Sequence, residues 1–263
     1  LISGGGSLLQ DSTSKKSLIY YLFVIFTAHF FKKNVIIFAQ GIGPINNKIL
    51  NKLTLTAIKK ARYITVRDNN SLKLLEGKGI NAILYPDPVW NIEIPNVKKT
   101  NKIGIQIRQH FSINNEFINI LAQSINKHYA GIEIVILSLQ NEQDMEISNK
   151  LKNELHKINP DIKVYVKENS SNKKIIEEIA SLEALIAMRY HACLIGIKSG
   201  IKVLPICYDI KVKQLADEFK IKYINPKDTT TIEDNISDFI KAEVYNYNQR
   251  ELNFNFSEIV KYI

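Results

Sequence analysis

Short apolar runs rich in β-branched residues alternate with longer segments of helical spacing along almost the whole chain. In the first half, this periodicity predicts strands over residues 1–3, 34–39, 63–66 and 82–85, with helices over 14–31, 47–61 and 70–77. In the second half, it predicts strands over residues 102–107, 133–139, 163–166, 184–188 and 202–208, again with helices between them. Such alternation favours an α/β fold with parallel sheets and helices on their faces.

The alternation stops once, over residues 92–100, where Pro95 and a pair of lysines indicate a linker. A linker between two such runs predicts two Rossmann-like domains, over residues 1–95 and 100–225. Residues 226–263 are expected to form a helical tail that packs back on the first domain. Because Leu1 already lies inside an expected strand, we expect the first domain to be incomplete at its N-terminus.

Two glycine-rich stretches follow apolar segments in the first half, and both are interpreted as turns between a strand and a helix. Such turns leave backbone N–H groups exposed beside the positive end of a helix, where an anionic ligand can bind. Glycine also serves any tight turn with positive φ, so neither stretch alone indicates a site. The candidate residues in these stretches are Gly5, Gly6, Ser7, Gln40 and Gly41.

Cationic side chains follow several of the expected strands in the second half. Arg108 comes after one buried strand, Arg189 and His191 after another, and Lys211 after the next. A single charge at such a place is usually solvated or paired, but ligands of parallel sheets bind at the carboxyl ends of strands. Arginine also matches carboxylate and phosphate with two parallel hydrogen bonds. The set therefore indicates a site for a small ligand with two anionic groups.

The overall charge indicates which partners the protein favours, and the surroundings of the cysteines indicate their chemical state. The net charge of +9 favours anionic partners such as phosphates, nucleic acid or an acidic membrane surface. Cys193 and Cys207 lie in apolar surroundings without metal-ligand spacing, which is typical of reduced core thiols. The longest apolar run, residues 18–31, is too short to span a bilayer and indicates a buried helix. Lys32 and Lys33 follow it, which leaves a role at a membrane interface as an alternative.

Several motifs together resemble the polysaccharide pyruvyl transferases, in particular those that pyruvylate cell-wall polymers of surface-layer bacteria. No single motif is specific, but they occur in the expected order from the first residue to about residue 220. They are Gly4-Gly5-Gly6-Ser7-Leu8-Leu9-Gln10-Asp11, Ala39-Gln40-Gly41-Ile42-Gly43-Pro44, Arg67-Asp68, Asp87-Pro88, Arg108, Met188-Arg189-Tyr190-His191-Ala192 and Tyr208-Asp209 with Lys211-Val212.

The resemblance implies a fold like that of GT-B glycosyltransferases, with the acceptor on the first domain and the donor on the second. The implied donor is phosphoenolpyruvate, and the implied acceptor is a sugar with two free hydroxyls, expected to be lipid-linked. The product would be a cyclic pyruvate ketal with release of phosphate, and no metal or cofactor is implied. The family normally begins with a further strand and an Asn-x-Gly-Asp turn, so we expect about thirty residues or more to be missing here.

The resemblance also implies a cytoplasmic enzyme of cell-wall biogenesis and S-layer anchoring, with the inner face of the membrane as an alternative location. We expect His191 to act as acid or base, since an imidazole titrates near neutral pH. Arg189 is expected to act in catalysis and in donor binding, together with Arg108 and Lys211 as donor ligands. The expected acceptor-side and loop residues are Gly5, Gly6, Ser7, Gln40, Gly41, Arg67 and Asp87.

Two other classes of function stay open at this point. A nucleotide-sugar glycosyltransferase of GT-B type would need a carboxylate for a ribose and an aromatic side chain for a base. Glu142 is a candidate for the carboxylate, but no convincing aromatic partner is present. A nucleic-acid binder fits the basic charge, yet the sequence has no recognised motif of that kind, so no nucleic-acid partner is expected.

Overall fold

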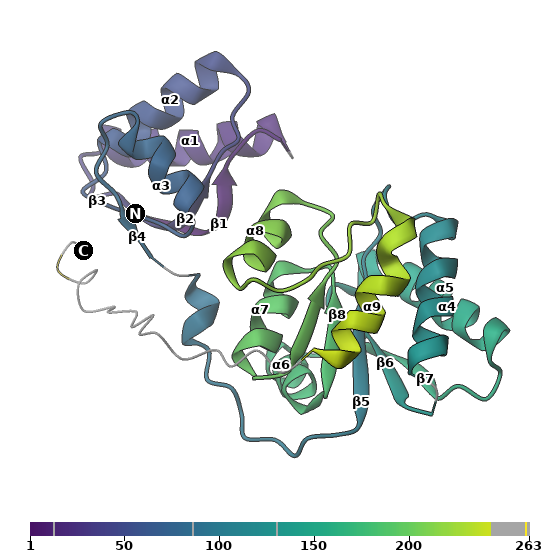
Figure 1. Ribbon diagram of the computed structural model, residues 1–263. Helices are drawn as coiled ribbons and strands as arrows, with labels where there is room; N and C mark the ends of the chain where they lie inside the picture. The colour runs from purple at the N-terminus through teal and green to yellow at the C-terminus, as the bar shows by residue number, and fades with distance from the viewer. Residues whose placement is uncertain (13, 86, 130, 243–260, 262–263) are drawn as a thin grey trace. The chain divides into compact units, whose positions relative to one another are not determined.

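The computed structural model describes residues 1–12, 14–85, 87–129, 131–242 and 261 of the chain (Figure 1). Residues 1–242 form two compact units, Leu1–Ile92 and residues 93–242. Each unit has its own parallel sheet and its own buried core of aliphatic side chains. The expected α/β class with parallel sheets is therefore confirmed.

The first unit contains a four-stranded sheet in the order β1-β2-β3-β4, with every neighbouring pair parallel. The strands are β1 (Ile2–Leu9), β2 (Ile36–Ile42), β3 (Tyr63–Val66) and β4 (Ile83–Leu84). The connections are α1 (Lys15–Phe30), α2 (Lys48–Lys59) and α3 (Asn69–Glu76), and the short 3-10 helix η1 (Pro88–Asn91) follows β4.

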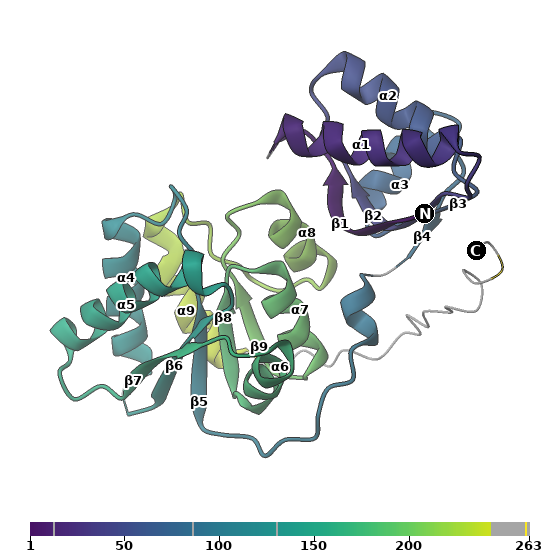
Figure 2. The same ribbon diagram turned by 180° about the vertical axis from the view of Figure 1, so that it is seen from behind.

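All three helices of the first unit cover the same face of its sheet (Figures 1 and 2). This follows from the strand order, because successive parallel strands joined by right-handed crossovers place their helices on one side. The core between the layers is built from side chains such as Leu18 and Ile25 of α1, Ile58 of α2, Leu75 of α3 and Ile37 of β2. The helices begin at polar caps: the Asn47 side chain accepts hydrogen bonds from Ile49 and Leu50 at the start of α2.

The glycine-rich stretches are not the turns expected from the sequence. β1 runs through Gly4, Gly5 and Gly6 to Leu9, and β2 runs through Gly41. At Gly4 the reason is steric, since a Cβ atom built there would lie 1.9 Å from the carbonyl oxygen of Phe38 on β2. Glycine is thus required at this position because β1 and β2 approach too closely for any side chain.

The second unit contains a five-stranded parallel sheet in the order β7-β6-β5-β8-β9. Its strands are β5 (Lys102–Gln106), β6 (Glu133–Ser138), β7 (Val164–Glu168), β8 (Ala184–Ala187) and β9 (Lys202–Pro205). After β7 the chain returns to the other side of β5, so the order reverses between β5 and β8. This position is the topological switch point, where doubly wound sheets bind their ligands.

Helices cover both faces of the second sheet (Figures 1 and 2). The helices α4 and α5 contact one another, and α7 contacts both α6 and α8. Their bounds are α4 (Asn115–His128), α5 (Asn141–Ile158), α6 (Asn172–Ser181), α7 (Tyr190–Lys198) and α8 (Ile210–Glu218).

The tail expected over residues 226–263 is described only in part. It starts with the 3-10 helix η2 (Thr229–Thr231) and α9 (Ile232–Lys241), and α9 packs against α4 and β9 of the second unit. Residues 243–260, 262 and 263 lie outside the described residues. Packing of the tail on the first domain stays a prediction.

Both cysteines are free thiols in the second unit. The Cys193 side chain is fully buried, and burial raises its pKa, while burial raises the pKa of Cys207 to about 12. Within the part of the chain that the structure describes, no helix is long and apolar enough to cross a membrane.

The close approach of β1 and β2 makes a stability prediction. We expect Gly4→Ala to lower the free energy of unfolding by about 1–3 kcal/mol, because the new methyl group forces the strands apart. Gly6→Ala is the matched control, since a Cβ atom there meets only the Leu8 side chain, with Cδ2 at 3.6 Å and Cγ at 3.9 Å, both ordinary contacts. Urea denaturation of both variants measures the difference; equal effects would mean that the strand spacing does not require glycine at position 4.

Candidate active site at the carboxyl ends of the second sheet

Four strands of the second sheet place polar side chains at the same edge. Arg108 follows β5, Gln143 and Asp144 lie in the first turn of α5 after β6, Arg189 follows β8, and Tyr208 follows β9. Since β5 and β8 are the strands that flank the switch point, Arg108 and Arg189 start from neighbouring strand ends. The structure therefore brings together two of the cations that the sequence predicted for one site.

The strongest interaction at this edge is a two-point ion pair between Arg189 and Asp144. Arg189 Nε donates to Asp144 Oδ2 at 3.0 Å, and Arg189 Nη2 donates to Asp144 Oδ1 at 2.6 Å. The side chain of Asp144 is fully buried, and that of Arg189 is 13% exposed. The same Oδ2 also accepts hydrogen bonds from the backbone N–H groups of Leu139 and Gln140, each at 3.0 Å.

This pairing changes the interpretation of Arg189. A bidentate carboxylate partner fixes the guanidinium in one orientation and offsets much of its charge. The geometry therefore makes Arg189 a positioning residue at the site, whereas the sequence predicted a cation available to the donor. The donor-binding role of Arg189 stays a prediction.

A buried glutamine joins the two central strands beside this ion pair. Gln106, at the end of β5, accepts the backbone N–H of Arg189 on its Oε1 at 2.8 Å. Its amide nitrogen donates to the carbonyl oxygen of Ile107 at 3.1 Å and to Asp144 Oδ2 at 3.4 Å. The start of α7 is thereby held against the end of β5, which keeps the switch point in one arrangement.

Arg108 has a different environment from Arg189. Its Nη2 donates to Gln143 Oε1 at 2.9 Å, its Nη1 donates to the Tyr208 hydroxyl at 3.4 Å, and its guanidinium carbon lies 5.7 Å from the Tyr208 ring centroid. Among the described residues no carboxylate forms an ion pair with Arg108, and its buried Nε has no hydrogen-bond partner. A cation with neutral partners keeps its charge available to an anionic ligand.

The two arginines share one acceptor. Gln143 Oε1 accepts from Nη2 of Arg108 at 2.9 Å and from Nη2 of Arg189 at 3.4 Å. Both guanidinium groups therefore lie within hydrogen-bonding distance of a single atom. Two cations this close repel one another, and the carboxylate of Asp144 lowers that cost.

His110 and Tyr208 form an aromatic contact next to Arg108. Their ring centroids are 5.0 Å apart, and His110 Nδ1 lies 2.7 Å from the Ser112 hydroxyl oxygen. Burial and, second to it, the charge of Arg108 hold the pKa of His110 below its usual value. Burial raises the pKa of Tyr208, with a further contribution from Asp209. Both effects favour the uncharged form of the His110 imidazole.

His191 and Lys211 lie at corresponding positions on two neighbouring helices. Each is the second residue of its helix, His191 on α7 and Lys211 on α8, and the two helices are in contact. The His191 side chain is exposed, with its ring centroid 5.5 Å from that of Tyr190, and Lys211 is half-buried. Because α7 follows β8 and α8 follows β9, both residues lie at the carboxyl edge of the sheet.

The candidate residues of the first unit form a separate network. Arg67 Nη1 donates to Asp87 Oδ2 at 3.0 Å, and Arg67 Nη2 donates to the Ser7 hydroxyl at 2.9 Å. The Arg67 and Asp87 side chains are 8% and 4% exposed. A Cβ atom on Gly41 would lie 2.3 Å from the Ser7 oxygen, so glycine makes room for these contacts. Ser7, Gly41, Arg67 and Asp87 therefore tie β1, β2, β3 and η1 together.

The other candidates of the first unit differ from one another in their surroundings. Gly5 is exposed and has a φ of 78°, a backbone conformation that glycine adopts without strain. Gly6 is half-buried, and it pairs with Gln40 in the sheet. The side chain of Gln40 is fully buried, and neither of its amide atoms has a hydrogen-bond partner among the described residues. A buried amide without a partner is rare, and the described residues of the first unit provide none for Gln40.

Asp144, Gln143 and Gln106 were not singled out from the sequence, and Tyr208 was noted only as part of a motif, with no role at the site. One signal for Asp144 was present: it occupies the buried stripe of α5 together with Ile147, Leu151 and Leu155. A carboxylate at a core position of an amphipathic helix needs a buried cation or several donors. No comparable signal pointed to Gln106. Among the described residues there is no group of His, Cys, Asp and Glu that could hold a metal ion.

A comparison with protein families supplies the classification that the geometry alone does not. The model for "Polysaccharide pyruvyl transferase" matches residues 1–210, which is most of the chain. The chain belongs to this family. The match includes β1, β2 and the strand ends that carry Arg108 and Arg189, and it ends next to Lys211. No curated protein sequence matches this polysaccharide pyruvyl transferase family member.

Solved structures show which fold the family member shares. UDP-GlcNAc 2-epimerase of Methanocaldococcus jannaschii, in complex with UDP-GlcNAc and UDP, matches 100% of this chain and 76% of its own, with a TM-score of 0.64 and 10% identity. The enzyme of Neisseria meningitidis, bound to UDP-GlcNAc, matches 91% and 68%, with a TM-score of 0.59 and 14% identity. S. aureus MnaA with UDP matches 93% and 68%, with a TM-score of 0.62 and 12% identity.

These matches establish the fold and nothing of the chemistry. The chain spans about two thirds to three quarters of the length of such structures. At these identities the likeness concerns the backbone fold, and it confirms the expected α/β, GT-B-like fold class with two Rossmann-like domains.

The Arg189–Asp144 pair makes a prediction about stability. Arg189→Ala leaves a buried carboxylate without its cation, so we expect it to lower the free energy of unfolding by about 3–5 kcal/mol. The double variant Arg189→Ala with Asp144→Ala removes both charges and is expected to cost less than the two single variants added together.

Urea denaturation of the two single variants and the double variant measures this coupling. Lys213→Ala is the control, because it breaks the exposed pair with Asp217 and is expected to change stability little. Strict additivity of the two single changes would show that the ion pair does not hold the strand ends.

Proposed function

We propose that this family member transfers pyruvate from phosphoenolpyruvate to two hydroxyls of one sugar, forming a cyclic ketal and releasing phosphate. The observation that carries the proposal is Arg108: a guanidinium at the switch point of the second sheet, bonded to neutral partners and not ion-paired with a described carboxylate. Phosphoenolpyruvate carries a carboxylate and a phosphate, so its pocket needs cations held in place by neutral groups.

The roles of the residues follow from their environments. Arg108 and Lys211 are assigned to the two anionic groups of the donor, since they start from β5 and from the helix after β9. Arg189 is tied to Asp144, so its main role is to hold Gln143 and the start of α7 in place. His191, exposed in the first turn of α7, is assigned to proton transfer.

The reaction balances with a single acid–base group at the site. A proton is added to the methylene carbon of phosphoenolpyruvate, and the first sugar hydroxyl attacks the adjacent carbon and loses its proton. The carbon–oxygen bond to phosphate then breaks, and the second hydroxyl closes the ketal ring. The protons of the two hydroxyls account for the new methyl group and for the released hydrogen phosphate.

The acceptor forms the second half of the proposal. We infer a sugar of a lipid-linked cell-wall polymer precursor, and anchoring of a surface layer as the process that the product serves. The support for this is the resemblance of the glycine-rich and Met188–Ala192 motifs to the transferases of surface-layer bacteria. Ser7, Gln40, Arg67 and Asp87 are assigned to the acceptor side.

The activity is tested by measuring phosphate release from phosphoenolpyruvate with synthetic acceptors that contain N-acetylmannosamine. Mass spectrometry of the acceptor should show the addition of a ketal-linked pyruvate. UDP-GlcNAc incubated with the same acceptors tests the alternative of a GT-B glycosyltransferase. Release of UDP without any consumption of phosphoenolpyruvate would overturn the proposal.

Variants at the donor site separate binding from chemistry. His191→Ala should lower kcat at least about a hundredfold and leave the Kd of phosphoenolpyruvate nearly unchanged, because proton transfer acts in the transition state.

Arg108→Ala should raise the Kd of phosphoenolpyruvate at least about tenfold, because a charged contact is lost in the ground state too. Arg108→Lys should restore binding only in part, since an ammonium group cannot reproduce the planar fork. Calorimetry and turnover measure both quantities, and near-normal turnover of His191→Ala would contradict the role of this residue.

A further inference from the structure

The helix α1 is apolar on the side that faces the sheet and also on the side that faces solvent. Leu18, Leu22 and Ile25 are buried in the core of the first unit. On the outer side, large side chains are exposed: Ile19 by 53%, Tyr20 by 61%, Phe23 by 68%, Phe30 by 81% and, one residue beyond the helix, Phe31 by 64%. A helix on the surface of an α/β unit is normally polar on its outer side. An apolar cluster of this kind indicates a binding surface.

Lysines stand at both ends of this apolar cluster. Lys15 and Lys16 begin α1, and Lys32 and Lys33 follow it directly. All four side chains are exposed, and none lies in direct contact with a described carboxylate, while the charge of Lys15 helps to lower the pKa of Asp11. Apolar side chains flanked by lysines are typical of helices that bind at a lipid interface. In such helices the ammonium groups reach the headgroups, and the rings lie among the upper parts of the acyl chains.

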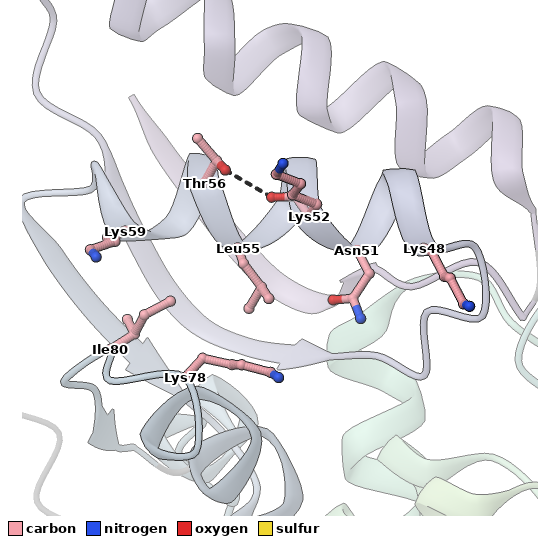
Figure 3. Close-up of a pocket in the computed structure, with 8 residues that line it drawn as sticks. All are labelled: Lys48, Asn51, Lys52, Leu55, Thr56, Lys59, Lys78 and Ile80. Carbon is pink, nitrogen blue, oxygen red and sulfur yellow. Dashed lines mark hydrogen bonds between the residues drawn. The ribbon is translucent and has the colours of Figure 1, made fainter.

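The neighbouring helix α2 adds a groove lined with further lysines. Figure 3 shows Lys48, Lys52 and Lys59 along α2 and Lys78 opposite them, in the turn that follows α3. The groove has a volume of about 380 Å³, and Leu55 and Ile80 contribute its apolar part. Its lining includes no carboxylate, and none of its four lysines is ion-paired within the described residues.

Several lysines of the second unit, unlike those of the groove, form ion pairs. There, Lys102 pairs with Glu133, Lys127 with Glu233, Lys167 with Glu178 and Lys222 with Asp238. Residues 1–92 hold twelve Lys and Arg against four Asp and Glu, which gives this part of the chain +8 of the total charge of +9. The charge of the protein is therefore concentrated on the unit that also exposes the apolar cluster.

We propose that the outer surface of α1 and α2 docks on an anionic lipid bilayer. The side chains of Ile19, Tyr20, Phe23, Phe30 and Phe31 enter the interface, and the lysines of the groove bind lipid phosphates. A cleft lined with charges of one sign attracts groups of the opposite charge. Four ammonium groups in one groove, none ion-paired within the described residues, therefore favour binding to a surface with many phosphates. A nucleic acid supplies phosphates too, but it offers no apolar layer for the exposed rings. This inference goes beyond the proposed function and does not depend on it.

Co-sedimentation with vesicles tests the docking surface in the absence of any substrate. The protein should bind vesicles of phosphatidylcholine that contain roughly one third phosphatidylglycerol, and binding should weaken as salt is added. Vesicles of phosphatidylcholine alone should bind it far less. Lys52→Gln with Lys78→Gln should lower the partition coefficient at least about tenfold, and Phe23→Ser with Phe30→Ser should do the same.

Matched control variants test whether vesicle binding depends on this surface or on any exposed lysine or phenylalanine. Lys60→Gln with Lys73→Gln removes two exposed lysines of the same unit that do not line the groove, and Phe111→Ser removes an 82% exposed phenylalanine of the second unit. Both should bind anionic vesicles nearly as well as the unchanged protein. Thermal melts of every variant check that each one is folded.

Three results would overturn the proposal: no binding to anionic vesicles, equal binding to neutral vesicles, or equal losses in the control variants. A fourth would assign the surface to a second copy of the chain. In that case the lipid-free protein would be a dimer in light scattering, and Phe23→Ser with Phe30→Ser would make it monomeric.

Discussion

One buried carboxylate holds together the edge of the second sheet at which the candidate site lies. Asp144 accepts hydrogen bonds from the loop after β6 and binds the guanidinium of Arg189 at two points. A charge removed from water must be compensated nearby, so the loop, α5 and the start of α7 adopt one arrangement. Arg108 and Gln143 take their positions from this arrangement, because Gln143 bonds to both arginines.

The first unit also has its strand ends held in one arrangement, both by closely spaced strands and by an ion pair. Gly4 allows β1 to contact the backbone of β2, and Gly41 leaves room for Ser7 beside Arg67. The Arg67–Asp87 pair then links the end of β3 to η1. In both units an arginine that looks like a ligand-binding residue in the sequence is paired with a buried aspartate. The charge that stays available for an anion is therefore found on other side chains, above all Arg108.

The fold of this protein is supported by similar solved structures, whereas its function is supported by its family and by the charges at the switch point. The GT-B-like fold is similar to that of epimerases solved with UDP-GlcNAc, so the fold by itself does not select a donor. Membership in the polysaccharide pyruvyl transferase family, together with a cation on neutral partners at the switch point, favours a small dianionic donor. The exposed apolar rings and lysines of the first unit lie outside that chemistry, and we therefore propose a separate partner for them.

The sequence by itself determined the order and the approximate bounds of the strands and helices, because their periodicity is a local property. The strand expected over 63–66 is found as Tyr63–Val66, and most other elements differ by one or two residues. It also located the strand ends at which Arg108, Arg189, His191 and Lys211 lie. Only the tertiary structure decided that β1 continues through its glycines and that Arg189 belongs to Asp144. Both depend on contacts between distant segments: Gly4 pairs with Phe38, and Asp144 lies 45 residues before Arg189. Local periodicity carries no information about such pairings, which arise when the sheet assembles.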